Sequence, residues 1–335
     1  MLYIRTDINE IIATGHMMRC LSIADAAKSH GEETTFILAD ENGKKYIENK
    51  GYQTIILHTI WSDMESELDI LQRIIAEENI ESLLIDSYMV TEEYLSVLSS
   101  QTKVAYIDDL NAFHYPVDIL ICYANYWRKF GYEERYDNTK LLLGSQYTPL
   151  RKVFCDCSSK TISSNTENLL LMSGGTDNFH ILEGLLQVIE KNKYRNIDVI
   201  CGRYNTDYEK LCRQYEEYRN IHFHKAVNNI ESYMKKADIA ISAGGTTLYE
   251  LCACGTPTIS YSFADNQIDN VEQFQKDELI DYAGDVRKTN IFENVKKLLN
   301  HYTKNYDLRK GRSRKMQQLI DGNGASRIVG ELIKI

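Results

Sequence analysis

Short apolar segments alternate with amphipathic ones along most of the chain, and this alternation limits the possible folds more than any other feature. Residues 34–38, 82–85 and 168–172 are short and rich in β-branched or apolar side chains, as expected of strands that are buried on both faces. Between such segments lie stretches with a helical period, such as residues 16–30. Strands buried on both faces and joined by helices form parallel sheets covered by helices. The sequence therefore predicts an α/β fold.

The alternation is interrupted once, near the middle of the chain. Residues 155–168 read CDCSSKTISSNTEN, which is polar, serine-rich and without period, as is typical of a linker. A chain of 335 residues is also long enough for two domains of about 150 residues. We predict two doubly wound, Rossmann-like domains at residues 1–150 and 151–335. In such sheets ligands bind at the carboxyl ends of the strands, so a ligand is expected in a cleft between the domains.

Charge and composition exclude several classes of protein. The chain has 38 Lys and Arg against 48 Asp and Glu, a net charge of −10, which argues against a nucleic-acid partner because phosphate backbones require a basic surface. No stretch approaches the roughly 18 apolar residues of a membrane span, and Arg5 and Asp7 lie where a signal peptide would be apolar. The eight cysteines form no CxxC pair, so neither a disulfide framework nor a zinc site is indicated. We expect a cytoplasmic protein with reduced thiols.

The most distinctive motif of the second half is ADIAISAGGTTLYELCACGTP, residues 237–257. A short apolar strand leads directly into Gly244 and Gly245, and a helix is predicted from Thr246. Glycines allow a ligand to approach the backbone closely, and the amide groups at a helix N-terminus attract phosphate. Glu250 lies on the same helix face as Thr246, where its carboxylate could accept hydrogen bonds from a ribose. The alternative is an ordinary glycine turn with a capping threonine, because the spacing matches neither a P-loop nor GxGxxG.

Two further segments place small or polar residues directly after strands. LLLMSGGTD ends in Gly174 and Gly175, and FADNQIDNVEQF carries Asn266 and Gln267. Taken alone, the glycine segment is interpreted as an ordinary strand-to-helix turn. The polar side chains of Asn266 and Gln267 would enter the ligand cleft, with a capped helix start as the alternative.

The first half offers one histidine in a chemically useful position. Gly15 and His16 follow the first predicted strand and begin the first helix, and Arg19 lies one turn further on. The helix dipole disfavours a positive charge at this end, so a neutral imidazole could act as a base on water or on a sugar hydroxyl. A lone histidine is more often structural. His222 and His224 share a strand face, but no third ligand lies at a suitable spacing, so no metal site is predicted.

Seven segments in a fixed order resemble a known family: GHMMRCLSIADA, LLIDSY, YIDDL, LLGSQYTPLRKVF, LMSGGTD, ISAGGTTLYELCACGTPTI and ADNQIDNVEQF. Together they are similar to the UDP-sugar hydrolases of pseudaminic acid biosynthesis, which act on UDP-2,4-diacetamido-2,4,6-trideoxy-β-L-altropyranose, and to their spore-coat polysaccharide relatives. The resemblance covers nearly the whole chain. The glycine turns are shared with the wider group of GT-B glycosyltransferases, including the peptidoglycan N-acetylglucosaminyltransferase.

The resemblance implies a GT-B fold and a reaction that needs no metal and no cofactor. In the first domain it implies that His16 positions or activates the attacking water, and that Asp86 and Tyr88 shape the water and sugar site. In the second domain it implies a UDP site. The diphosphate would lie at Gly244, Gly245 and Thr246, and the ribose at Glu250. Asn266 and Gln267 would face the sugar or the diphosphate, and the loop around Val227 would take the uracil.

The chain departs from the family in one place, since Ala13 replaces the first glycine of the usual glycine-x-glycine-histidine loop. A methyl group there could shift His16, which affects the choice of substrate. The leading hypothesis is a UDP-sugar hydrolase that inverts the anomeric centre. The alternatives are a GT-B glycosyltransferase that uses a UDP-sugar donor, and a protein that binds a nucleotide sugar without turnover. The sequence indicates a UDP-sugar as partner and does not identify pathway enzymes.

Overall fold

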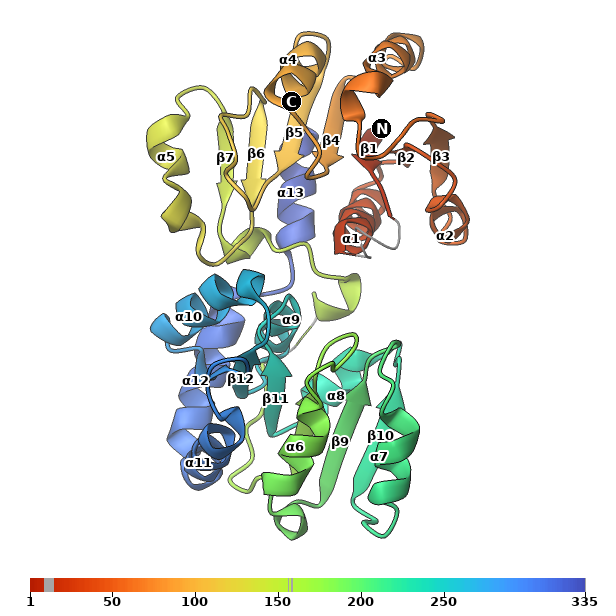
Figure 1. Ribbon diagram of the computed structural model, residues 1–335. Helices are drawn as coiled ribbons and strands as arrows, with labels where there is room; N and C mark the ends of the chain where they lie inside the picture. The colour runs from red at the N-terminus through yellow and green to blue at the C-terminus, as the bar shows by residue number, and fades with distance from the viewer. Residues whose placement is uncertain (9–14, 156, 158, 335) are drawn as a thin grey trace. The chain divides into compact units, whose positions relative to one another are not determined.

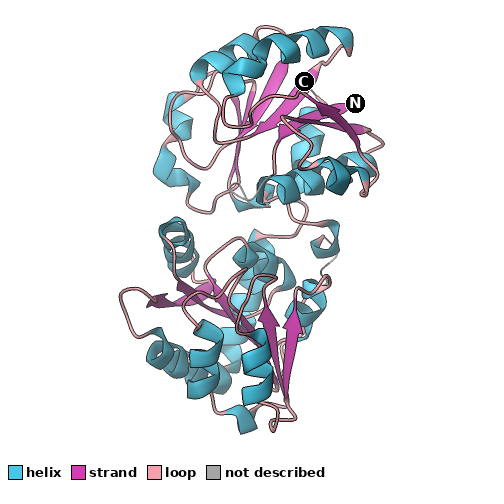
Figure 2. Cartoon of the chain, turned by 45° about the vertical axis from the view of Figure 1, so that its right-hand side comes forward, coloured by secondary structure: helices cyan, strands magenta, loops and turns pink. Residues whose placement is uncertain are grey.

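The computed structural model describes residues 1–8, 15–155, 157 and 159–334, which fold into two units. Unit 1 comprises Met1–Lys152 together with Gly322–Ile335, and unit 2 comprises Val153–Asp321. Each unit contains its own sheet, and helices cover both faces of that sheet (Figures 1 and 2). Ala13, at which the chain departs from the resembled loop, lies outside the described residues.

The sheet of unit 1 has seven strands among the described residues, all parallel, in the order β3-β2-β1-β4-β5-β6-β7. These strands are β1 (Leu2–Thr6), β2 (Thr34–Leu38), β3 (Gln53–Ile56), β4 (Ser82–Asp86), β5 (Lys103–Ile107), β6 (Ile119–Cys122) and β7 (Lys140–Leu143). The helices of unit 1 are α1 (Gly15–Ser29), α2 (Lys44–Glu48), α3 (Leu68–Glu77), α4 (Glu92–Ser99), α5 (Tyr132–Arg135) and α13 (Gly324–Leu332), with 3-10 turns η1 (Met64–Glu67), η2 (Trp127–Phe130) and η3 (Ser145–Tyr147).

Alternation within the strands creates two cores in unit 1. Because successive strand residues face opposite sides of a sheet, Ile4 packs with the residues of α1 and α13, whereas Tyr3 packs on the other face with α3 and α4. Both side chains are buried. The predicted burial of the strands on both faces is therefore confirmed for the central strands of this sheet.

Unit 2 repeats the arrangement with six parallel strands in the order β10-β9-β8-β11-β12-β13. The strands are β8 (Asn168–Met172), β9 (Asn196–Cys201), β10 (Ile221–Lys225), β11 (Ile239–Ala243), β12 (Thr258–Ser262) and β13 (Ile280–Asp285). The helices are α6 (Ile181–Val188), α7 (Tyr208–Gln214), α8 (Ile230–Lys236), α9 (Thr247–Cys254), α10 (Ile268–Lys276), α11 (Ile291–Lys304) and α12 (Tyr306–Leu319), with 3-10 turns η4 (Lys152–Phe154), η5 (Lys191–Lys193) and η6 (Asp265–Gln267). In both units the strand order reverses beside the first strand, as in doubly wound sheets.

Most predicted elements are present, and the strands that the sequence missed lie at sheet edges. The predicted strands 34–38 and 168–172 have the observed bounds. The helix predicted over residues 16–30 is observed as α1, Gly15–Ser29. The two missed strands, β7 and β13, pair with only one neighbour each. Strand β13 reads IDYAGD and lacks the continuous apolar run on which the predictions depend. Strand β7 reads KLLL, so its run of three leucines was present and was overlooked.

The last helix differs from the predicted domain assignment, which placed all of residues 151–335 in the second domain. Helix α13 instead packs in unit 1 against α1. Ala325, Ile328, Val329 and Leu332 follow a helical spacing and are all buried in the core that α1 shares with the sheet. The packing of this apolar stripe against α1, rather than position along the chain, places the helix in unit 1.

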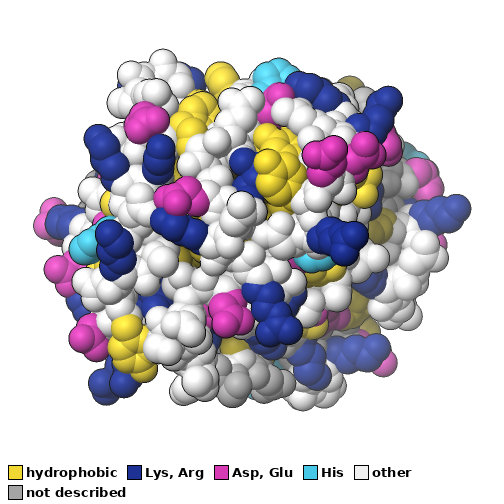
Figure 3. Space-filling view, turned by 90° about the horizontal axis from the view of Figure 1, so that it is seen from below, with side chains coloured by type: hydrophobic (Ala, Val, Ile, Leu, Met, Phe, Trp, Pro, Cys, Tyr) yellow, Lys and Arg dark blue, Asp and Glu magenta, His cyan; other side chains and the backbone are white. Residues whose placement is uncertain are grey.

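The surface carries both signs of charge. On the face drawn in Figure 3, Lys and Arg side chains lie interspersed with Asp and Glu, and apolar side chains are scattered among them. Among the described residues, no helix is both long and apolar enough to cross a membrane.

Two glycines of α13 allow a matched test of its docking. A Cβ added at Gly324 would lie 2.2 Å from the carbonyl oxygen of Thr148, whereas one added at Gly330 meets nothing within 4 Å. We expect Gly324→Ala to lower the free energy of unfolding of unit 1 by about 1–3 kcal/mol, because backbone atoms must shift. Gly330→Ala should raise it by about 0.5–1 kcal/mol, as alanine is the better helix former. Urea denaturation of both variants would measure this, and equal effects would contradict the docking of α13 on unit 1.

Candidate active site

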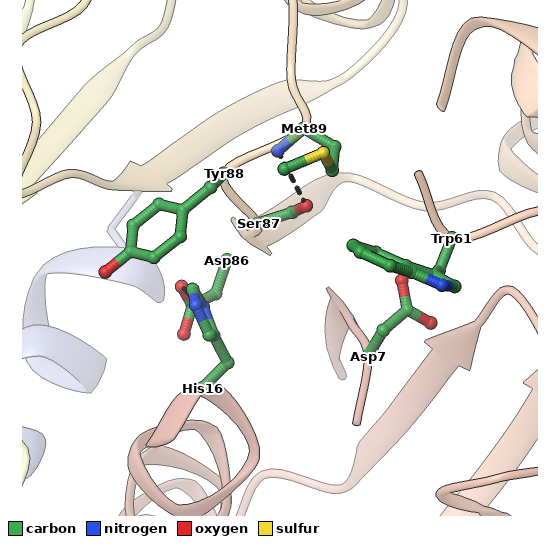
Figure 4. Close-up of a pocket in the computed structure, with 7 residues that line it drawn as sticks. All are labelled: Asp7, His16, Trp61, Asp86, Ser87, Tyr88 and Met89. Carbon is green, nitrogen blue, oxygen red and sulfur yellow. Dashed lines mark hydrogen bonds and ion pairs between the residues drawn. The ribbon is translucent and has the colours of Figure 1, made fainter. Parts of the chain in front are cut away.

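A cavity of about 210 Å³ lies at the carboxyl ends of β1 and β4 in unit 1. These two strands are neighbours in the sheet, with Thr6 opposite Asp86, and the strand order reverses beside them. Ligand sites of doubly wound sheets lie at such a reversal. The residues that line the cavity are Asp7, His16, Trp61, Asp86, Ser87, Tyr88 and Met89 (Figure 4).

The centre of this site is a buried carboxylate with two basic partners. Asp86, only 1% exposed, lies at the end of β4. Its Oδ1 atom is 2.6 Å from Nδ1 of His16, and its Oδ2 atom accepts a hydrogen bond from Nε of Arg19 at 2.6 Å. His16 and Arg19 are three residues apart on α1, so both side chains lie on the helix face that meets β4.

The charged groups of this cluster stabilise one another in their ionised forms. Burial disfavours ionisation of Asp86, but Arg19 and His16 outweigh this effect and hold the pKa of the Asp86 carboxyl well below its usual range. Burial likewise opposes the charge of Arg19, yet Asp86 raises the pKa of that guanidinium well above its usual value. The carboxylate and the guanidinium are therefore both charged at neutral pH.

The hydrogen bond to Asp86 defines the tautomer of His16. An ionised carboxylate can only accept hydrogen bonds, so Nδ1 of His16 carries the proton and donates it to Asp86. The nearby Arg19 Nη2, 2.9 Å from the same Nδ1, then directs its own hydrogen to Asp86 Oδ1 at 2.5 Å. Nε2 of His16 is left with its lone pair and can accept a proton, and Asp86 can stabilise the imidazolium that results.

Tyr88 completes the surroundings of His16. Its ring meets the imidazole edge to face, with ring centroids 4.5 Å apart and an interplanar angle of 80°, and both rings are drawn in Figure 4. The predicted first-domain residues His16, Asp86, Tyr88 and Arg19 are thus brought together by the fold. Gly15, the first residue of α1, is exposed and does not line the cavity.

A second buried ion network lies beside the same cavity. Nε and Nη2 of Arg5 donate to the two carboxylate oxygens of Glu67, each at 2.8 Å, and Nη1 donates to Asp7 at 2.5 Å. Arg5 and Glu67 are completely buried. Burial raises the pKa of the Asp7 carboxyl, although Arg5 acts in the opposite direction. The network fixes Asp7 in the wall of the cavity.

The sequence analysis missed several residues of this cavity. Asp7 ends β1 much as Asp86 ends β4, so its place after a buried strand could have indicated it. Trp61 lies in a segment with neither a period nor a motif, and no local signal could have found it. Ser87 and Met89 flank the predicted Tyr88.

Unit 2 contains its own cavity, of about 420 Å³, at the carboxyl ends of its strands. It too lies beside the reversal of strand order, between the turns that follow β8 and β11. Six of the predicted substrate-binding residues line it: Gly174, Gly175, Gly245, Thr246, Glu250 and Gln267. Other lining residues that the sequence analysis did not single out include Ser242, Ile230 and Phe263.

The start of α9 faces this cavity with backbone groups. Thr246 precedes the helix but makes no side-chain capping bond, so the alternative of a capping threonine is wrong. The first amide groups of a helix have no carbonyl partner within it and carry the positive end of the helix dipole. Helix α9 therefore offers the cavity a place for an anion.

Three predicted residues do not line the cavity of unit 2. The backbone amide of Gly244 donates to Tyr261, and a Cβ at Gly244 would lie 2.2 Å from Val271 of α10, so close packing already requires glycine there. Asn266 is exposed in η6, and Val227 is half-buried after β10. Their assigned contacts with the ligand stay predictions.

Gln267 has a structural bond as well as a place in the cavity wall. Its side-chain oxygen accepts the amide of Phe263 at 3.0 Å, which holds the turn after β12. In the part of the chain that the structure describes, no group of three or more His, Cys, Asp and Glu side chains is arranged to hold a metal ion.

Comparison with known proteins identifies the fold. Over its full length the chain is similar in structure to MurG of Acinetobacter baumannii, with a TM-score of 0.73 and 11% identity, covering 100% of this chain and 99% of that one. The chain has the GT-B fold, with two Rossmann-like domains, as predicted. Residues 169–322 match the family model described as the glycosyltransferase family 28 C-terminal domain.

Three relatives show how far the sequence similarity extends. The spore coat polysaccharide biosynthesis protein SpsG of Bacillus subtilis is 22% identical over 95% of this chain and 93% of its own length. Protein MJ1062 of Methanocaldococcus jannaschii is 25% identical over 76% of this chain. The UDP-N-acetylglucosamine--N-acetylmuramyl-(pentapeptide) pyrophosphoryl-undecaprenol N-acetylglucosamine transferase of Helicobacter acinonychis is 30% identical over 55% of this chain. The chain spans about half the length of the latter two, 54% and 55%.

The ion cluster around Asp86 makes stability depend on pH. Because the folded state holds the pKa of Asp86 below its unfolded value of about 3.9, the stabilisation is complete above that value and is lost as the pH falls below it. We expect Asp86→Asn to lower the free energy of unfolding by about 3–5 kcal/mol at pH 7, since a buried charge loses its partner. The difference from the wild type should shrink below about pH 4. Urea denaturation across this pH range measures it.

The control is Glu41→Gln, which removes the carboxylate of an exposed pair with Lys44. It should change the free energy of unfolding by less than about 1 kcal/mol. A difference between wild type and Asp86→Asn that stayed constant down to pH 2 would show that folding does not lower the pKa of the Asp86 carboxyl.

Proposed function

We propose that this protein is an enzyme of polysaccharide biosynthesis that hydrolyses a UDP-activated amino-deoxy sugar at the anomeric carbon. The observation that carries the proposal is the geometry of His16, whose Nδ1 is engaged by Asp86 while its Nε2 is left to accept a proton at a cavity. Similarity to the spore coat polysaccharide protein SpsG over nearly the whole chain supports the biosynthetic assignment.

In the proposed reaction, His16 acts as a general base on water. As the water oxygen bonds to the anomeric carbon, Nε2 takes its proton, the bond from that carbon to the diphosphate oxygen breaks, and UDP leaves. Attack from the side opposite UDP inverts the anomeric centre. Asp86 lies next to the imidazolium that forms on proton transfer and can stabilise its charge.

Unit 2 is proposed to hold the UDP group. The first amides of α9 would meet the diphosphate, and they would stabilise the charge that develops there as the bond breaks. Glu250 lies one turn into the same helix and lines the same cavity, where its carboxylate would accept hydrogen bonds from the ribose. The match of residues 169–322 to a glycosyltransferase C-terminal domain supports this assignment. The roles of Asn266, Gln267 and Val227 belong to the same proposal.

A glycosyltransferase is the second candidate. The similarity to the Helicobacter acinonychis transferase at 30% identity favours it, and the same base could act on a sugar hydroxyl instead of water. The deciding experiment is UDP release from a panel of UDP-sugars, without acceptor and with EDTA present. The panel includes UDP-N-acetylglucosamine and 2,4-diacetamido-6-deoxy sugars. Rapid release from a diacetamido sugar supports hydrolysis, whereas UDP-sugar binding without release would favour the transferase.

Substitutions in the two units should affect different kinetic constants. We expect His16→Ala to lower kcat on the order of a hundredfold or more, because a positioned base is lost, while the Kd for UDP changes little. Glu250→Ala should instead weaken UDP binding by about tenfold, as a charge-assisted hydrogen bond is lost. Steady-state kinetics together with calorimetric titration of UDP separate the two effects. Normal turnover by His16→Ala, or a parallel loss of UDP affinity, would contradict the assigned role.

A further inference from the structure

Tyr88 is held at its hydroxyl end by one carboxylate. Its hydroxyl donates to Oδ2 of Asp109 at 3.1 Å, while the residue as a whole is 42% exposed. The backbone beside it is fixed separately, since Ser87 accepts the amide of Met89 at 3.1 Å (Figure 4) and its own carbonyl accepts from Tyr106. These bonds fix the turn after β4 but not the direction of the Tyr88 ring.

The two adjacent aspartates of the YIDDL segment have different tasks. Asp108 is buried and accepts hydrogen bonds from the hydroxyls of Tyr115 and Tyr132. It also accepts hydrogen bonds from the backbone amides of Leu110 and Asn111, and so it anchors the loop after β5. None of these bonds involves the side chain of Asp109. The loop therefore has its own support, independent of Asp109.

The position of the Asp109 carboxyl is unfavourable for the stability of the fold. Its Oδ1 atom is buried and has no hydrogen-bond partner among the described residues. Burial raises the pKa of its carboxyl, with Arg19 and the Tyr88 hydroxyl acting in the opposite direction. A carboxyl with one buried and unpartnered oxygen destabilises a fold. The side-chain bond from Tyr88 to Asp109 is therefore the feature, among the described residues, that a function would explain.

We propose that Asp109 is a positioning residue for the base of unit 1: by accepting the Tyr88 hydroxyl, it holds the Tyr88 ring against the imidazole of His16. Asp86 holds the imidazole at Nδ1, and the edge-to-face contact with Tyr88 restricts the ring from a second side. With both contacts in place, Nε2 keeps a fixed position in the cavity wall. The inference rests on the proposed role of His16 as a base.

A double-mutant cycle tests whether Asp109 acts through Tyr88. We expect Asp109→Ala and Tyr88→Phe each to lower kcat for UDP release by about tenfold or more, because small displacements of a base are expensive, with KM changed less than twofold. The double variant should be no slower than the slower single variant. Multiplying effects, or a change in KM alone, would overturn the proposal. Asp109→Asn retains an oxygen that can accept the Tyr88 hydroxyl, so it should retain most of the activity.

A measurement without substrate separates this inference from the proposed function. The Tyr88 ring shifts the proton resonances of the His16 imidazole, and NMR detects that shift in the unliganded protein. Asp109→Ala and Tyr88→Phe should move these resonances toward those of Tyr88→Ala, whereas Asp109→Asn should leave them near the wild type. Unchanged resonances in folded Asp109→Ala, or in Tyr88→Phe if Asp109→Ala does not fold, would overturn the positioning role. Shifted resonances in an enzyme that releases no UDP would instead contradict only the proposed function.

Discussion

The ionised carboxylate of Asp86 is the feature on which unit 1 depends. Such a charge is tolerated inside a protein only when its partners replace the lost water, and here Arg19 and His16 do so. The same bonds dock α1 on β4 and determine which nitrogen of His16 is free to accept a proton. One interaction thus contributes to the fold, to the tautomer of the base and to the location of the cavity.

Both cavities follow from the topology of their sheets. In a doubly wound sheet the connections diverge where the strand order reverses, so helices cannot close the sheet edge at that point. In unit 1 this opening receives His16 from the start of α1 and Asp86 from the end of β4. In unit 2 it receives Gly175 and Gly245, from the turns after β8 and β11. The lining of the first opening includes two acids and an imidazole, which suit it to proton transfer. The lining of the second includes three glycines and the start of α9, which suit it to an anion.

Much of the fold could be predicted because the relevant signals are local. Strands such as 34–38 and 168–172 were predicted from their runs of apolar and β-branched residues. The edge strand β13 has no such run, whereas β7 has three consecutive leucines and was overlooked. The unit to which α13 belongs was also missed, because its apolar stripe is compatible with either core until the docking partner is known.

The site divides in the same way. The sequence by itself determined the candidate residues, such as His16 beside Arg19 and Glu250 beside its glycine turn, because a motif consists of residues that are neighbours in the chain. Only the tertiary structure decided that Asp86 orients His16, that Trp61 and Asp7 share its cavity, and that Asp109 reaches Tyr88. These partners lie far apart in the chain. They meet because the carboxyl ends of parallel strands all lie at one edge of the sheet.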